Sequence, residues 1–559
     1  MILRYYNNNN SSCRITILTL LLMLVSKSFS LLHSKTNTII RQRHFISKTT
    51  RFMMSQTSAK NNNRDNASNL VVVIAGPTGV GKSDVAAKFC SMNNGIIVSA
   101  DSVQAYRGPQ IGANKPTEEE LKETPHLLID VVNSEAKYNA AEWYYDAKTC
   151  IELLSNTSKT TTTTNTNGDT NEDEETNRSA ERYGRFKSDI EKAIKNKGYD
   201  TTKHIVPVVV GGTMMYIQWL VHGRPDAIQP TQDAIEKSQQ MIDKIQKDNS
   251  EKDNSDEKAW DEAVEYVSSL DPIFRDRVTK FAKNDWYRLR RTMEIAFTTM
   301  TLESNTNNTN NDDKTTNSNT TTTSLFSGIR EGGLSVDDDD DLNSSNYDVR
   351  CFFLCPSDRM KHTSVLDKRC EEMLSRGLIQ ETTELVLTEQ LPDMATKAIG
   401  YRQVLEYLNR EQNGKDDGIE VLDQFINNFT TATRRYAKRQ MAWFRKDTKF
   451  VFVPVESEDN RSIDTVTRNI QEYCSMSRSE YESVLKDESS SSHQMRIQNE
   501  KQGKNMKFYQ FQRYKFQKGS DALNSLLTIA KDCTTKITQF QKEKNTYDDD
   551  DNLERKKQR

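Results

Sequence analysis

The stretch Gly76-Pro-Thr-Gly-Val-Gly-Lys-Ser83 has the residue types and spacing of a phosphate-binding loop, G-x-x-x-x-G-K-[S/T]. Its glycines let backbone N–H groups curl around an anion, Lys82 adds a positive charge, and the helix that follows presents its positive end. Ser83 is then placed to hold Mg²⁺ through its hydroxyl. The phosphate-binding residues that this pattern predicts are Gly76, Thr78, Gly79, Gly81, Lys82 and Ser83. The motif alone does not define the reaction, because hydrolases, small-molecule kinases and some transferases share it.

Two further polar residues follow predicted strands. Ile96–Ser99 is an apolar run that leads into Asp101, and Ile205–Val210 is another that leads into Thr213. Ligands of parallel α/β sheets bind beyond the carboxyl ends of the strands, so we expect Asp101 and Thr213 beside the phosphate loop. Asp and Thr are also common helix N-caps, and position alone leaves the capping and the functional interpretation equally open.

The elements that must position these residues follow an α/β pattern. The apolar run Leu70–Ala75 precedes the loop, a helical segment over Asp84–Met92 follows it, and a strand comes next. This order predicts a P-loop NTPase-like parallel sheet, and we expect Asp348–Cys355 to return to it. The pattern beyond Gly223 is helical and charged, which predicts a run of helices there.

Composition separates foldable from polar parts in this chain of 559 residues, of which only 35% are hydrophobic. Residues 155–180 and 301–346 are rich in Thr and Asn and carry acidic runs, which predicts disordered insertions in surface loops. The predicted organisation is a leader and linker over 1–69, an α/β core over 70–225, a helical domain over 226–283, the second part of the core over 284–455 and a charged tail over 456–559.

The first 64 residues contain ten Lys or Arg and no Asp or Glu. Their apolar run Ile15–Val25 has eleven residues, fewer than the roughly 20 that span a bilayer. A basic, hydroxyl-rich stretch follows, so we expect a leader for import into a mitochondrion or a plastid, and no stable membrane association of the mature form. Met53 or Met54 is expected to start a cytosolic form. An unstructured Asn-rich extension is the alternative.

Basic residues recur at helical spacing in two places. Arg288 and Arg291 lie at i and i+3, a pairing that suits phosphate groups, although a solvated face is the simpler interpretation of this pair alone. In the helix predicted over Thr430–Lys449, one sector is basic and only Asp447 is acidic, which favours a polyanion partner. The basic residues of that sector are Arg434, Arg435, Lys438, Arg439, Arg445, Lys446 and Lys449.

Eight ordered blocks closely resemble the tRNA dimethylallyltransferase family, also called tRNA isopentenyltransferases. The blocks are GPTGVGKS (76–83), ADSVQAYRG (100–108), GANKPT (112–117), PHLLID (125–130), VVVGGTMMYIQWLVHG (208–223), NDWYRLRRTMEI (284–295), KAIGYRQ (397–403) and AKRQMAWFRKD (437–447). The resemblance covers nearly all of Val71–Val453 outside the two polar insertions. It implies that the helical segment over 226–283 is an inserted tRNA-binding domain that grips the anticodon loop.

The resemblance implies that the loop holds the diphosphate of dimethylallyl diphosphate with Mg²⁺, and that the prenyl group goes to the exocyclic amine of the adenosine 3′ of the anticodon. The catalytic residues that it implies are Lys82, Asp101 as general base, Thr213 and Arg288. The tRNA contacts that it implies are Ser102, Gln104, Arg291, Lys397, Gly400, Tyr401, Arg402, Arg435 and Arg439. Whether Arg288 or Arg291 faces the diphosphate stays open. The expected partner is the tRNA anticodon stem-loop, and the protein is expected to be a monomer.

Three other functions compete with this interpretation. An adenylate isopentenyltransferase of the cytokinin type shares the first blocks, but its mononucleotide substrate needs neither the basic helix nor the block at Lys397–Arg402. A P-loop kinase of small metabolites is the second rival, and an RNA-binding protein without catalysis is the third. The C-terminal region lacks the paired Cys and His of the zinc finger found in some eukaryotic members, so extra tRNA grip there must come from charge, as in Lys501–Lys518.

Overall fold

The computed structural model describes residues 69–157, 174–225, 230–251, 256–307, 330–331, 334, 347–410, 418–456 and 460–557. These residues belong to one unit, Ser68–Arg559, so the predicted leader lies outside them. Within the described ranges, no helix is both long and apolar enough to cross a bilayer.

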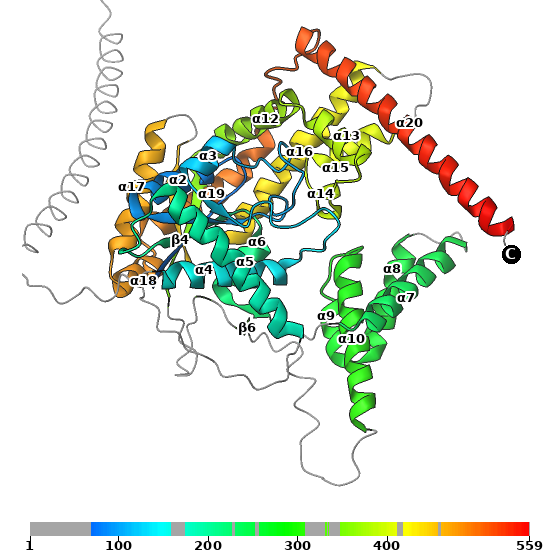
Figure 1. Ribbon diagram of the computed structural model, residues 1–559, viewed down its shortest axis with the longest axis horizontal. Coiled ribbons are helices and arrows are strands. Elements are labelled where there is room, and N and C mark those ends of the chain that lie inside the picture. The colour runs from blue at the N-terminus through cyan, green and yellow to red at the C-terminus, as the bar shows by residue number, and fades with distance from the viewer. Residues whose placement is uncertain are drawn as a thin grey trace, which may run out of the picture. The chain divides into compact units, whose positions relative to one another are not determined.

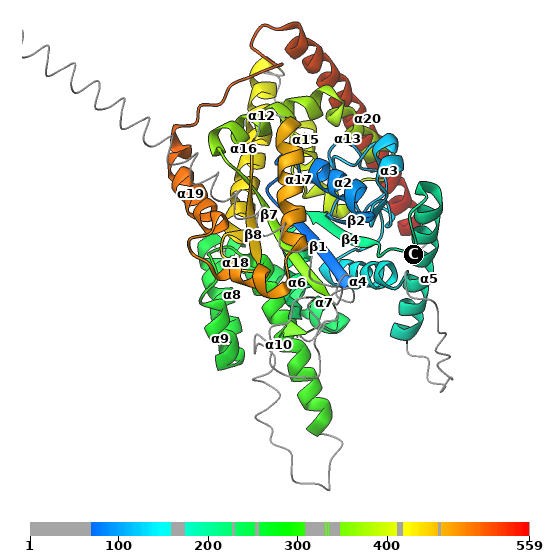
Figure 2. The ribbon, with the colours of Figure 1, turned by 90° about the vertical axis from the view of Figure 1, so that its left-hand side faces the viewer.

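One six-stranded parallel sheet forms the centre of the fold, with helices around it (Figure 1). Its strand order is β3-β2-β4-β1-β7-β8, of which Figure 2 shows β2, β4, β1, β7 and β8 side by side. The strands are β1 (Leu70–Ala75), β2 (Gly95–Ala100), β3 (His126–Leu127), β4 (Val206–Gly211), β7 (Asp348–Pro356) and β8 (Phe450–Val455). On the central strand, Val72 pairs with Val208 of β4 and with Arg350 of β7. The predicted α/β fold and the returning strand are confirmed.

Helices cover both faces of this sheet, which explains why its strands are almost continuously apolar. On β1, Val71 and Val73 belong to the core beneath α4 (Ala140–Asn156), α6 (Met214–His222) and α16 (Ile419–Phe444). The alternate residues Val72 and Ile74 pack on the other side, against α2 (Lys82–Asn93) and α17 (Asn460–Ser475). Figure 2 shows α2 and α17 in front of the strands.

Four helices form a bundle of their own, drawn in green in Figure 1. They are α7 (Gln232–Glu251), α8 (Asp256–Leu270), α9 (Pro272–Val278) and α10 (Trp286–Asn307). Their core includes Trp260 and Ala263 of α8 together with Leu289 and Met293 of α10. The predicted helical domain is therefore present, but its predicted boundary near 283 is wrong, because the apolar face of α10 packs inside the bundle and not on the α/β core.

Parts of both predicted insertions are ordered. The helix α4 continues to Asn156, and α5 (Glu174–Lys197) begins within the range 155–180. In the second insertion, α10 continues to Asn307, and β6 (Arg330–Glu331) pairs with β5 (Arg224–Pro225). Composition set the predicted limits too wide, because a polar composition does not exclude a helix. The rest of both insertions lies outside the described residues.

A second helical layer holds the predicted basic helix. It contains α12 (Arg359–Ser375), α13 (Leu378–Leu387), α14 (Asp393–Thr396), α15 (Tyr401–Leu408) and α16. The helix predicted over Thr430–Lys449 begins earlier and ends at Phe444, because Asp447 and its neighbours form a turn before β8.

The predicted charged tail over 456–559 is wrong as a structural description. The described part of this region forms α17, α18 (Arg478–Lys486), α19 (Ser491–Asn505), the short helix η3 (Met506–Phe508) and α20 (Asp521–Lys557). Ile470 and Tyr481 are buried against the sheet, and Leu526 of α20 is buried in the core shared with α13. Each helix buries only a narrow stripe, so its composition resembles that of a solvated segment.

Tyr481 anchors α18 to the sheet and provides a test of this packing. Its hydroxyl accepts a hydrogen bond from the backbone N–H of Cys351 (2.9 Å) and donates one to the carbonyl of Cys351 (3.0 Å). Because Tyr481→Phe removes both of these buried hydrogen bonds, we expect a loss of about 1–3 kcal/mol in the free energy of unfolding, measured by urea denaturation. The control is Tyr473→Phe, since the Tyr473 hydroxyl makes no hydrogen bond among the described residues. Equal stability of the two variants would show that the C-terminal helices contribute little.

Candidate functional site

The phosphate loop lies between β1 and α2 and has the backbone that its glycines predict. Gly79 (φ 73°) and Gly81 (φ 89°) adopt left-handed conformations, which cost other residues energy. Lys82 begins α2, and its Nζ donates hydrogen bonds to the carbonyls of Gly76 and Pro77, each at 3.0 Å. The ammonium group is therefore held over the loop.

Two buried side chains clamp the middle of this loop. The backbone N–H of Thr78 donates to Gln440 Oε1 (2.9 Å), and the Thr78 carbonyl accepts from His362 Nε2 (3.0 Å). Burial lowers the pKa of His362 to about 4, so its imidazole is a neutral donor near pH 7. Gln440 also donates from Nε2 to the Gly212 carbonyl (2.8 Å). A helix from the far end of the chain thus fixes both the loop and the end of β4.

Asp101 combines the capping role and the cavity position that its sequence context left open. Its Oδ1 accepts the backbone N–H groups of Val103 (2.9 Å) and Gln104 (3.3 Å). Its Oδ2 accepts no hydrogen bond among the described residues, and the side chain lines the cavity beside the phosphate loop. One oxygen therefore fixes the carboxylate while the other stays available to a ligand.

Thr213 lies on the same rim, as predicted from the strand order. It caps the start of α6 without a capping hydrogen bond from its side chain, and its Oγ1 accepts the N–H of Ser102 (3.3 Å). Both residues line a second cavity. The predicted neighbours Asp101 and Thr213 are thus brought together.

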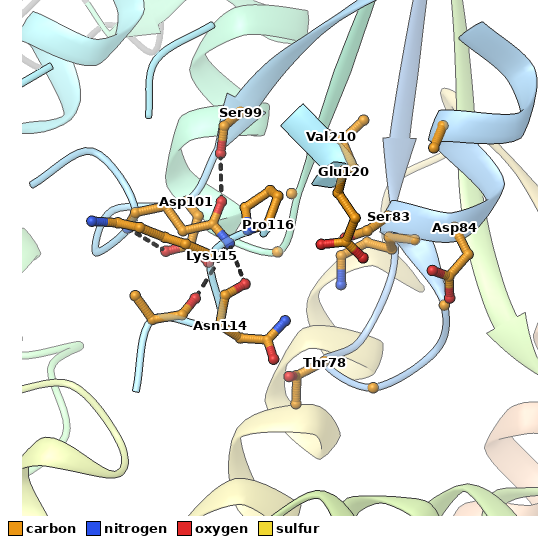
Figure 3. Close-up of a pocket in the computed structure, with 18 of the residues that line it drawn as sticks. Thr78, Ser83, Asp84, Ser99, Asp101, Asn114, Lys115, Pro116, Glu120 and Val210 are labelled. Carbon is orange, nitrogen blue, oxygen red and sulfur yellow. Dashed lines mark hydrogen bonds between the residues drawn. The ribbon is translucent and has the colours of Figure 1, made fainter. Parts of the chain in front are cut away.

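Two cavities meet at the carboxyl end of the sheet. One, of about 520 Å³, contains the phosphate loop, and the other, of about 320 Å³, is lined by Thr213, Lys397 and Arg439 with apolar neighbours. The residues that line both are Thr78, Asp101, Ala113, Arg369 and Tyr436. Figure 3 shows Ser83 and Glu120 on one side of the larger cavity and Asp101 on the other. The arrangement suits two substrates that react beside Asp101.

Arg369 is the functional candidate that the sequence analysis missed. It lies on α12, is partly buried and lines both cavities, and burial lowers the pKa of its guanidinium. The only sequence signal is its place beside the apolar stripe of Leu366, Cys370 and Met373, where an arginine is costly without a partner.

Arg288 and Arg291 do not line either cavity. Both lie on α10 in the helical bundle. The Arg288 side chain is 61% exposed and contacts Asp285 (3.4 Å), and Arg291 contacts Glu294 (3.1 Å). Arg369 thus lies at both cavities, where a catalytic arginine is expected, and the catalytic role predicted for Arg288 stays a prediction.

Several predicted tRNA contacts have structural roles. Tyr401 is fully buried and donates its hydroxyl proton to Glu381, and Gly400 has a φ of 101° that favours glycine. The Gln104 amide donates to the carbonyls of Ala113 (3.2 Å) and Asn114 (3.0 Å) and accepts from Ser99 (2.9 Å). The reason in each case is that these polar groups already have partners inside the fold.

The basic helix keeps part of its predicted free face. Arg434 does not belong to this free face, because its guanidinium forms an ion pair with the buried Asp367 (2.8 Å). Arg435 is exposed and has no ion pair among the described residues, whereas Arg439 reaches the second cavity. Arg402 and Lys397 each pair with an acidic residue one turn away.

The loop also offers an oxygen donor for a divalent cation. Ser83 lines the larger cavity, and its hydroxyl has no hydrogen-bond partner among the described residues. Glu120 and Asp84 line the same cavity, and oxygen donors of this kind suit Mg²⁺. The described residues contain no cluster of three or more His, Cys, Asp or Glu side chains placed to bind a metal. The side chains thus fit a cation held jointly by Ser83 and a bound phosphate compound.

Comparisons with known proteins find a matching family model, similar sequences and similar solved structures. The IPP transferase family model matches residues 104–162 and 177–447. The chain is 33% identical over 383 residues to tRNA dimethylallyltransferase 9 of Arabidopsis thaliana, covering 67% of this chain and 69% of that protein. It is 30% identical over 392 residues to the tRNA dimethylallyltransferase of Protochlamydia amoebophila, covering 70% and 85%. Among solved structures, the tRNA isopentenylpyrophosphate transferase of Bacillus halodurans matches with 21% identity and a TM-score of 0.39, covering 74% of this chain and 99% of that one.

The phosphate loop at the carboxyl end of a parallel sheet places the chain in the class of P-loop-like α/β proteins. The sequence matches narrow this class. The chain belongs to the IPP transferase family, which confirms the resemblance seen in the sequence blocks.

The clamp on Thr78 leads to a test with inorganic diphosphate. Gln440→Leu removes the partner of the Thr78 N–H and leaves the Gly212 carbonyl with only the longer hydrogen bond from the Tyr436 hydroxyl (3.3 Å), so the loop should lose its fixed shape. We expect the affinity for inorganic diphosphate, measured by calorimetry, to fall by about tenfold or more, since each unsatisfied group costs roughly 1–3 kcal/mol.

A matched control for this variant is Gln502→Leu. Gln502 makes the same two kinds of hydrogen bond at the start of α12, to the N–H of Arg359 (3.0 Å) and the carbonyl of Ser357 (2.8 Å). It should lower the melting temperature but leave diphosphate affinity unchanged. Equal losses of affinity in the two variants would contradict a specific role of the clamp.

Lys82 predicts a pH dependence of anion binding. Burial, with Arg369 close by, lowers the pKa of Lys82 to about 7, against an opposing effect of Asp101. Because this pKa is lowered, Lys82 is charged below about pH 7 and loses its charge as the pH rises through that value. Diphosphate affinity should therefore weaken above this pH by up to about tenfold per unit.

The comparison for this pH dependence is Lys82→Arg, whose guanidinium stays charged throughout. Diphosphate affinity is measured by calorimetry for both proteins over a range of pH at constant Mg²⁺. Protonation of diphosphate itself affects both proteins equally, so the difference between their pH profiles reports the charge of Lys82. Parallel pH profiles of the two proteins would show that Lys82 keeps its proton.

Proposed function

We propose that this chain transfers a dimethylallyl group from dimethylallyl diphosphate to the exocyclic N6 amine of the adenosine 3′-adjacent to the anticodon of tRNA, and releases diphosphate. Membership of the IPP transferase family supports a prenyl transfer, and both curated relatives are tRNA dimethylallyltransferases by name. The observation that carries the proposal is the place of Asp101, where the phosphate-loop cavity meets a second, more apolar cavity.

The departure of diphosphate is the step that the phosphate loop would promote. The allylic carbon–oxygen bond breaks as negative charge collects on the leaving oxygen, and fixed N–H groups and cations beside that charge lower the barrier. Lys82 and Arg369 line this cavity, and the clamp of Gln440 and His362 keeps the loop ready to accept the anion. Mg²⁺, when bound, would neutralise further charge on the diphosphate, and Ser83 would hold it.

Asp101 would accept the proton that the attacking amine must lose. As the carbon–nitrogen bond forms, the N6 proton moves to the unpartnered Oδ2, and the electron pair of the carbon–oxygen bond leaves with the diphosphate. A carboxylate whose other oxygen is fixed by two backbone N–H groups is already oriented for this transfer.

The second cavity would receive the adenine. Met373, Ile399 and Phe429 give it apolar walls, and Arg439 lies at the same cavity. A base in a folded anticodon loop has to leave its stack to reach such a site, as in other enzymes that modify bases. Arg435, exposed on the same helix as Arg439, would bind the RNA backbone. The helical bundle α7–α10 would grip the rest of the anticodon stem-loop.

One set of assays separates this function from its rivals. The full chain, with labelled dimethylallyl diphosphate, should prenylate a tRNA anticodon stem-loop and not free AMP. Transfer to AMP alone would identify an adenylate isopentenyltransferase. Transfer of the γ-phosphate of ATP to a small metabolite would identify a kinase.

The leader and the oligomeric state complete the proposal. The basic, acid-free segment before Asp65 supports import into a mitochondrion or a plastid, with a cytosolic form from Met53 or Met54, and the mature protein is proposed to act as a monomer. A single size class on immunoblots of every compartment would count against two forms.

Asp101→Asn tests the proposed base directly. Asn is nearly isosteric and keeps the two capping hydrogen bonds through its own Oδ1, so both substrates should bind normally. Turnover should fall by a factor on the order of 10² to 10⁴, the usual contribution of a positioned base. The measurement is single-turnover transfer at saturating substrates, and a rate close to that of the unmodified protein would restrict Asp101 to a capping role.

A further inference from the structure

The segment Lys501–Ser520, which we name the basic strap, runs from the C-terminal end of α19 to the start of α20. Its sequence, KQGKNMKFYQFQRYKFQKGS, contains five lysines and one arginine but no Asp or Glu. The whole chain has a formal net charge of −3, so the charge of the strap is a local feature. The phosphate-loop site described above uses none of these residues.

Buried carboxylates fix the strap to α12 and α16. The fully buried Glu371 accepts the backbone N–H groups of Tyr514, Lys515 and Phe516. Asp367, also fully buried, accepts the Tyr509 hydroxyl proton (2.6 Å). Binding three consecutive N–H groups with one buried carboxylate holds the backbone in a single shape, because leaving any of them unpaired is costly.

The same contacts leave the lysines of the strap without anionic partners. Asp367 and Glu371 are occupied as described, and Arg513 contacts Asp423 (2.6 Å). The strap lysines are Lys501, Lys504, Lys507, Lys515 and Lys518. All five are exposed, and none forms an ion pair or hydrogen bond through its ammonium group within the described ranges. Beside them Phe508 is 66% exposed, with Lys507 Nζ 5.0 Å from the centre of its ring.

The strap adjoins the rim of the phosphate-loop cavity. The Tyr514 hydroxyl bonds to Ser364 of α12, and Lys368 Nζ lies 4.8 Å from the centre of the Tyr514 ring. Lys368 in turn lines the larger cavity. A nucleic acid that places one base in the joined cavities would therefore have other parts of its backbone within reach of this surface.

We propose that the basic strap is a second RNA-binding surface, which holds backbone phosphates of the tRNA outside the nucleotide that is modified. The proposal rests on the proposed tRNA substrate. Lysines without an acidic partner bind phosphates with the release of counterions, and no ion pair within the protein has to break. Exposed Phe508 offers a face on which an unpaired base stacks. The rigid anchoring means that little ordering is needed when RNA binds.

The test compares tRNA binding by the full chain with that of a variant carrying glutamine at all five strap lysines. Binding is measured by fluorescence anisotropy without dimethylallyl diphosphate, over a series of salt concentrations. The tRNA Kd should rise about tenfold or more near 0.15 M salt, and the slope of log Kd against log salt should fall by roughly two units or more. Phe508→Ala should weaken binding with little change in that slope. In transfer assays, kcat at saturating tRNA should stay within about twofold, since the lysines lie outside the catalytic group.

The matched control removes five exposed lysines that already have acidic partners. These are Lys88, Lys122, Lys192, Lys203 and Lys536. An equal rise of Kd in strap and control variants would reduce the effect to net charge and overturn the proposal. So would unchanged tRNA binding together with lost binding to phosphatidylserine vesicles, which would assign the strap to a membrane surface. Failure of the proposed enzymatic function would be distinct, because the unmodified protein would then transfer no prenyl group even where it bound tRNA.

Discussion

The backbone of Thr78 is the point on which the site depends. Its N–H and its carbonyl are held by Gln440 and His362, so neither group turns toward solvent. The neighbouring glycines lose conformational entropy when they adopt left-handed conformations. The buried hydrogen bonds from Gln440 and His362 to Thr78 offset part of that cost. Because Gln440 also binds Gly212, the same residue fixes the distance between the phosphate loop and the end of β4. The anion site exists only when α12 and α16 pack on the sheet.

The sequence pattern was enough to predict those features of the fold that depend on neighbouring residues in the chain. The phosphate loop, the strands and the rim positions of Asp101 and Thr213 follow from glycine spacing, apolar runs and strand order. The clamp is different, because His362 and Gln440 lie 284 and 362 positions from Thr78, and no periodicity links them. Arg369 was missed for the same reason. Its place at the cavities comes from the packing of α12, which no local pattern determines.

Polar residues were wrongly predicted to contact tRNA or solvent where their side chains form hydrogen bonds inside the fold. Tyr401 and Gln104 match the family blocks, yet their polar groups close hydrogen bonds within the fold. The C-terminal region is rich in charged residues, yet Tyr481 binds β7, and three of the region's backbone N–H groups donate to Glu371 of α12. A residue type in a motif indicates that the position is constrained. It does not indicate whether the constraint comes from a ligand or from the fold, and only the partners of each polar atom decide that.

Asp101 shows that the two kinds of constraint can meet in one side chain. A carboxylate has two oxygens, and here Oδ1 is bound by backbone N–H groups while Oδ2 lines the joined cavities. The capping contact therefore removes rotational freedom from the group that would accept a proton, so the entropy of positioning is lost during folding and not during reaction. By the same logic, the clamp on Thr78 orders the phosphate loop before any anion arrives. Folding thus orders the phosphate loop, which would bind the leaving diphosphate, and Asp101, which would accept the proton, before the substrates bind.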